Sequence, residues 1–176
     1  MIDLTKKTGF ECIPEDLQKI SELMIADDKL SKLLFYTDKR CFNNPELNTE
    51  EKVNLIKEEY IQIIPSIKVA DDNRIKSYIN LNFDQFTPNE TNSQYINGLL
   101  MIDILCHKDV WKIINREGKI SLRPYEIANR IMKICDNKKF EGIGKMQFTH
   151  GEQTMLATDT NYMGLTLKFL FVNSRF

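Results

Sequence analysis

Apolar residues recur at every second position in three segments of the second half of the chain. In residues 79–84, Ile79, Leu81 and Phe83 alternate with polar side chains, and the same period runs over 95–107 and 162–172. Successive side chains of a strand point to opposite faces, so this period predicts three β-strands. Both faces of the segment 95–107 are partly apolar, which indicates a strand that is central or covered on its second side.

The first part of the chain follows the helical period instead. Residues 14–24 are expected to form a helix with Pro14 in its first turn, and residues 28–36 a second, short helix. A third helix is expected to begin at Asn48, because Glu51 stands at the capping-box distance from it. Its expected inward face consists of Val53, Ile56 and Tyr60.

The remaining segments complete the predicted sheet. Residues 123–136 carry the clearest helical pattern, whereas 109–117 suit either a short helix or a strand. Residues 87–93 are expected to form a turn and 143–149 a strand. Residues 150–161 are expected to form a polar loop, longer than a usual hairpin connection. The expected buried stripe of the helix is Ile127, Ala128, Ile131, Ile134 and Cys135.

Together these patterns predict an α+β fold. The expected architecture is an antiparallel or mixed sheet of about four strands with one packed helix, plus an N-terminal helical segment. We place the helical extension at residues 1–68 and the sheet domain at 69–176, within one compact unit. A sheet of this size leaves its edges and the long loop available for contacts with other chains.

Acidic and basic residues almost balance in this chain. The 24 basic and 25 acidic residues give a formal net charge of -1, so no overall field attracts nucleic acid or an anionic membrane. No apolar run approaches the roughly 20 residues that a membrane helix needs. No signal peptide is visible either, so we expect a soluble protein.

The sequence shows no pattern typical of a metal or cofactor site. Its cysteines and histidines are Cys12, Cys41, Cys106, Cys135, His107 and His150, and they form no CxxC pair. Cys106 and Cys135 fall in apolar patterns, which predicts buried, reduced thiols in a cytosolic compartment. Because zinc-ligand spacing is missing, we expect neither a structural metal nor a cofactor.

Three short constellations could carry chemistry. Asp103 with Glu117 and Lys119 could hold a magnesium ion for phosphodiester attack, although the same acid-x-Lys spacing recurs at three other places in the chain. Cys106 and His107 are adjacent in a strand and face opposite ways, so they cannot act together as nucleophile and base. The run 142–144, Gly-Ile-Gly, follows a helix instead of preceding one, which predicts a turn and no phosphate site.

The candidate contact residues are one tryptophan and part of the predicted loop. Trp111, with Lys108, Lys112 and Arg116, could stack on nucleic acid, but an anchor in the core or in an interface is the favoured interpretation. The loop adds the candidates His150, Glu152, Gln153, Thr154, Met155 and Leu156. We therefore expect Trp111→Ala, or removal of the loop, to impair assembly or partner binding.

The second half of the chain resembles the tail terminator and neck proteins of long-tailed bacteriophages. The resemblance rests on LLMIDI at 99–104, RPYEIANRI at 123–131, GIGKMQF at 142–148 and YMGLTLKF at 162–169. It covers roughly the last eighty residues, and the strand near residues 78–86 less closely. The helical part before residue 69 departs from the minimal family pattern, which leaves the terminator and other neck components open as alternatives.

The resemblance implies a mechanical, non-enzymatic function in the virion. Copies would form a ring, typically of six, that ends the tail tube and meets the head-tail connector. DNA would pass through its lumen without specific binding, and no membrane would be involved. A ring needs heterologous interfaces that close on themselves, and sheet edges are suitable elements for these. A soluble adaptor module and a magnesium-dependent nuclease are the alternative functions.

Overall fold

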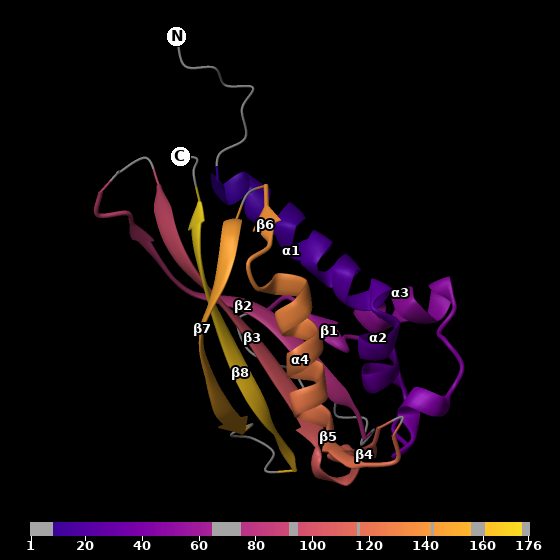
Figure 1. The fold of residues 1–176 in the computed structure, drawn as a ribbon. Helices are drawn as coiled ribbons and strands as arrows, with labels where there is room; N and C mark the ends of the chain where they lie inside the picture. The colour runs from indigo at the N-terminus through magenta and orange to yellow at the C-terminus, as the bar shows by residue number, and fades with distance from the viewer. Residues whose placement is uncertain are drawn as a thin grey trace.

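The computed structural model describes residues 9–64, 75–91, 95–115, 117–141, 143–155 and 161–173. Helices pack against one face of a curled sheet (Figure 1). The α-helices are α1 Gly9–Ala26, α2 Asp28–Phe35, α3 Thr49–Lys57 and α4 Arg123–Cys135; short 3-10 turns lie at η1 Cys41–Asn43 and η2 Lys108–Val110. None of the helices in these ranges is both long and apolar enough to cross a membrane.

The main sheet has six strands in the order β1-β2-β3-β8-β7-β6. Their bounds are β1 Ile61–Gln62, β2 Ser77–Pro88, β3 Ile96–His107, β6 Lys139–Phe140, β7 Gly144–Met155 and β8 Tyr162–Asn173. Only β1 and β2 pair in parallel, so the sheet is mixed. A separate hairpin joins β4 Lys112–Ile114 to β5 Ile120–Leu122.

The α+β class is confirmed, but the prediction of about four strands and one helix understated the fold. Two of the strands in the main sheet, β1 and β6, contain two residues each, too few for alternation to reveal them. The ambiguous segment 109–117 contains the end of η2 and all of β4. The central position predicted for 95–107 is confirmed, because β3 pairs with β2 on one side and β8 on the other.

The predicted loop at 150–161 is wrong over its first half. Strand β7 continues to Met155 and pairs with β8 along that length. Its residues beyond Met146 are almost all exposed, so apolar alternation fades although the backbone stays extended. Residues 156–160, including the candidate Leu156, lie outside the described residues, as do Arg116 and Gly142.

Local signals placed the N-terminal helices well, with two corrections. The capping box is present, because Asn48 Oδ1 accepts from the Glu51 N–H at 3.0 Å and Glu51 Oε2 accepts from the Asn48 N–H at 2.8 Å. Helix α1 begins at Gly9, so Pro14 lies inside it and not in its first turn. In α3 the fully buried residue is Leu55, whereas Val53 is exposed. Of the expected inward face, Ile56 does pack against the core, Val53 does not, and Tyr60 packs against the core from beyond the end of α3.

One apolar core joins the N-terminal helices to the sheet. Met24 of α1 and Leu33 of α2 belong to the same buried cluster as Ile102 of β3 and Phe169 of β8. Helix α4 contributes Ile127 and Ile131, which are fully buried. The helices thus cover one face of the sheet, and β7, which has only the two-residue β6 beyond it, lies toward the margin of this core (Figure 1).

Candidate assembly interface

Strand β7 has an outer edge that is only partly paired. Its first residues contact β6, where Lys145 pairs with Lys139 and Gly144 with Phe140. The Met146 N–H donates to the Lys138 carbonyl, and its own carbonyl accepts from the Asn137 N–H, both at 2.9 Å. The Phe148 N–H donates to Asp136 Oδ1 at 2.9 Å. Among the described residues, nothing pairs with the outer backbone of 149–155. Within the part of the chain that the structure describes, this stretch is therefore an open sheet edge.

The outward backbone groups follow from the pairing pattern. In an antiparallel ladder, alternate residues direct their N–H and C=O away from the partner strand. The N–H groups of Met146 and Phe148 point away from β8, as their partners show. The register then shifts at a β-bulge at Thr149, after which alternation directs outward the backbone groups of Gly151, Gln153 and Met155.

One face of this edge is apolar. Phe148, Met155 and Met163 are 39%, 55% and 43% exposed, and Met155 pairs directly with Met163 across β7 and β8. Alternation predicts Met163 on the buried face with Phe169; it shares that face, but the described elements leave it 43% exposed. Exposed apolar side chains beside unpaired backbone form the combination that strand addition requires.

The opposite face of the same strands carries a polar network. Lys168 Nζ lies 2.8 Å from Glu152 Oε1, and His150 Nε2 lies 3.7 Å from Glu152 Oε2. The hydrogen bond from Lys168 and its positive charge lower the pKa of the Glu152 carboxyl, and Glu152 in turn raises the pKa of Lys168. Charged side chains on an edge limit indiscriminate edge-to-edge pairing.

Asp103 lies on that polar face in the centre of the sheet. Its Oδ2 accepts from Asn82 Nδ2 at 2.9 Å, and its Oδ1 accepts from Thr166 Oγ1 at 2.6 Å. The carboxylate therefore ties together three neighbouring strands, β2, β3 and β8. Glu117 and Lys119 lie elsewhere, in the turn of the β4–β5 hairpin, where their charged atoms are 3.0 Å apart.

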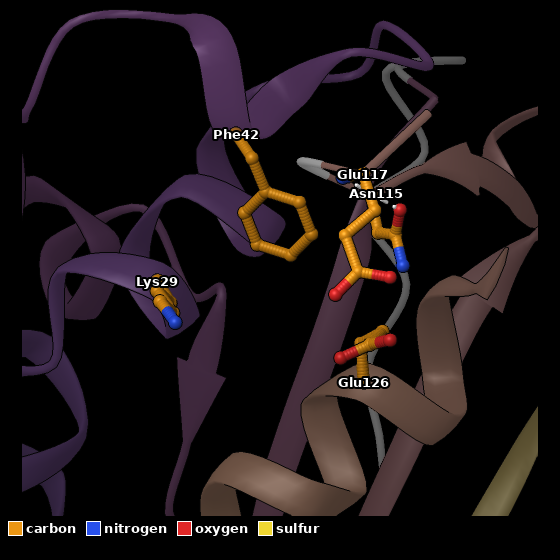
Figure 2. A pocket seen from close by; sticks show the side chains of 5 residues that line it. All are labelled: Lys29, Phe42, Asn115, Glu117 and Glu126. Carbon is orange, nitrogen blue, oxygen red and sulfur yellow. Dashed lines mark hydrogen bonds between the residues drawn. The ribbon is translucent and has the colours of Figure 1, made fainter. Parts of the chain in front are cut away.

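Glu117 faces a small hollow with a second carboxylate. The hollow, of about 200 Å³, is lined by Lys29, Phe42, Asn115, Glu117 and Glu126. Figure 2 shows the Glu117 and Glu126 carboxylates on the same side of this hollow, beside the Phe42 ring. Glu126 accepts from Ser121 at 2.6 Å. In the described part of the chain, no three His, Cys, Asp or Glu residues gather as a metal would require.

The structure separates the other candidates from the edge. Trp111 caps η2 just before β4 and packs, half-buried, against the main core. Cys106 and His107 face opposite ways as predicted: burial raises the pKa of Cys106 to about 11, while the His107 ring contacts Tyr162 with centroids 5.1 Å apart. Of the predicted contact residues, His150 and Glu152 come together, and 153–155 continue along the same strand.

The curled sheet, its helical cover and the partly paired edge of β7 define an α+β protein. The family model YomW matches residues 27–171, so the chain belongs to the YomW family. The family name is phage-derived, from a Bacillus SPbeta-like phage, which associates this protein with bacteriophages. No curated protein matches the chain.

Proposed function

We propose that this chain is a structural assembly protein of a bacteriophage particle, and that it joins a second copy through the outer edge of β7. The observation that carries the proposal is the open stretch 149–155, with exposed Phe148, Met155 and Met163 beside it. The phage association of the family supports it. In this function the chain contributes binding surfaces and no catalysis.

The outer edge of β2 is the counterpart that we propose for β7. Strand β1 pairs only with Ile79 and Asn80, and the backbone of β2 from 81 to 85 has no outer partner among the described residues. Strands β2 and β7 lie near opposite sides of the sheet and run in opposite directions. A neighbour's β2 beside β7 would therefore continue the sheet as an antiparallel pair.

Such a head-to-tail contact is heterologous. It closes into a ring when the rotation that relates neighbouring copies is a whole fraction of a full turn. The finer proposal is a ring of about six copies that acts as a tail terminator or neck ring of the virion. The ring would end the tail tube, contact the connector proteins, and let DNA pass through its lumen. The resemblance of the second half to tail terminator and neck proteins supports this part.

Two measurements test the proposal. Quantitative mass spectrometry of purified phage particles is expected to find the chain in a fixed, small number of copies. Native mass spectrometry of the purified chain, alone or after addition of tail tubes, is expected to find a closed oligomer. If the chain is absent from washed particles, the virion function is refuted. If it is present in particles but native mass spectra show only the monomer, with and without tail tubes, the ring is refuted.

A further inference from the structure

A groove separates α1 from the C-terminal end of α4 and strand β6. Its volume is about 510 Å³, and its apolar floor is formed by Leu23, Ile134 and Phe140. Leu23 is 42% exposed, whereas Phe140 is buried at 3%. Figure 1 shows β6 beside α1, above the end of α4, so α1 and the distant α4–β6 region together form this groove.

The rim of the groove is strongly basic. Lys19, Lys133, Lys138 and Lys139 line it, all are exposed, and none of them has an ion pair among the described residues. The acid that lines it, Asp27, is already engaged by Arg130. Within the described residues, the rim therefore carries four lysines that form no ion pair, in a chain whose total charge is close to zero.

The arrangement of β6 concentrates this charge further. Lys139 stands directly opposite Lys145 in the β6–β7 pair. Like charges in directly opposite positions destabilise a strand pair. An anionic group bound here would reduce the repulsion between these two lysines. Binding of a negatively charged partner would therefore stabilise the β6–β7 pair.

The floor distinguishes between the two common anionic partners. Single-stranded nucleic acid is held by phosphate contacts and by bases stacked on exposed aromatic faces, and a duplex mainly by phosphate contacts, which make no use of an apolar floor. The aromatic residue of this groove, Phe140, is buried, and the exposed floor is aliphatic. An aliphatic floor between charged rims fits an amphipathic protein segment, whose apolar side chains enter the groove while its carboxylates meet the lysines.

We propose that this groove binds an acidic, amphipathic segment of a partner protein, with an aliphatic side chain beside Leu23 and Ile134 and carboxylates at Lys133 and Lys139. The site is separate from the β7 edge and does not rest on the proposed ring. An adjoining hollow, lined by Asp28 and Glu46 among others, ends the basic region toward α2. The bound segment is thus expected to place its acidic residues at the β6 end.

The test is fluorescence anisotropy with the full chain and a labelled peptide of about 14 residues, roughly 20 Å long as a helix. The peptide carries Glu and Leu at helical spacing; its controls replace Leu by Ser or Glu by Lys. We expect saturable binding with a dissociation constant of about 10–100 μM, and we expect this binding to weaken in high salt. The control peptides are expected to bind at least about tenfold more weakly.

Chain variants locate the site. Lys133→Glu with Lys139→Glu is expected to weaken binding at least about tenfold, and Leu23→Ser about fivefold. The control variant Lys108→Glu with Lys112→Glu makes the same charge change on η2 and β4. Its dissociation constant for the peptide is expected to stay within about twofold of the native value. Circular dichroism spectra confirm that each variant is folded.

Three outcomes would overturn the proposal. The first is the absence of saturable peptide binding up to about 1 mM. The second is an equal loss in both pairs of charge variants, which would indicate unspecific attraction. The third is tighter binding of a DNA duplex that Leu23→Ser leaves unchanged, which would make the groove a phosphate-binding surface. Native mass spectra are independent of all three, so failure here does not affect the proposed ring.

Discussion

Arg123 is expected to be the polar side chain on which the packing of the helices depends most. It is 1% exposed and stands at the first position of α4. Its guanidinium donates to four backbone carbonyls: Val110 at 2.7 Å, Leu33 at 2.5 Å, Tyr36 at 2.7 Å and Asp38 at 3.0 Å. Burial lowers the pKa of this group, but arginine keeps its charge in proteins. It therefore joins the end of α2 to the start of α4.

The cost of Arg123→Met can be worked out from these contacts. A buried acceptor that loses its donor costs about 1–3 kcal/mol. Part of the loss from four missing donors is offset, because the folded methionine variant does not pay the desolvation cost of a buried guanidinium. We expect a net loss of about 3 kcal/mol in the free energy of unfolding. For a chain of this size, that lowers the melting temperature by about 6–12 °C.

Equilibrium urea unfolding measures this directly. Arg123→Lys is expected to lose about 2 kcal/mol, because one ammonium group cannot reach all four carbonyls. Lys133→Met removes a charge from the exposed side of the same helix and is expected to change stability by at most about 0.5 kcal/mol. If the free energy of unfolding of Arg123→Met stays within about 1 kcal/mol of the native value, the four carbonyl hydrogen bonds are not what holds α2 to α4.

Three further predictions concern the sheet and the thiols. Gly164→Ala places a Cβ 1.7 Å from a backbone oxygen of β3 and is expected to cost over about 2 kcal/mol in urea unfolding, whereas Gly118→Ala, in open space at φ +79°, costs about 1 kcal/mol. Lys168 lowers the pKa of Glu152, so this carboxylate stabilises the fold above its ordinary pKa of 4.5, and the gain is lost as pH falls through the lowered value. Glu152→Gln should therefore lower the melting temperature at neutral pH but leave it unchanged near about pH 2; a difference that persists there would contradict the ion pair. The four buried cysteines, with the pKa of Cys106 raised to about 11, should resist Ellman's reagent at about pH 8 until the chain unfolds.

The strands with a buried face could be predicted because their side chains alternate. In β3, Leu100, Ile102 and Ile104 lie on the face turned to the core, and all three are fully buried. The capping box at Asn48 was equally visible, because both of its residues act locally. These features depend on contacts within a few residues, which a single sequence records.

The edge of the sheet could not be predicted in the same way. Beyond Met146, β7 has solvent on both sides, so apolar alternation does not mark it as a strand. Its pairing with β8 depends on contacts made by residues distant from it in the sequence. The same limit applies to Arg123, whose position marked a helix start but whose carbonyl partners lie up to 90 residues away. Sequence patterns identified residues 150 and 152–155 as contact candidates, but not the edge that they form.

The most direct test of the proposed β7 contact is native mass spectrometry of Gln153→Pro beside Gln153→Ala. The Gln153 N–H points away from β8, so proline removes an outward donor and keeps the β7–β8 ladder intact. We expect Gln153→Ala to form the same oligomer as the native chain, and Gln153→Pro to remain a folded monomer. An unchanged oligomer in Gln153→Pro would contradict the assembly of this protein through the β7 edge.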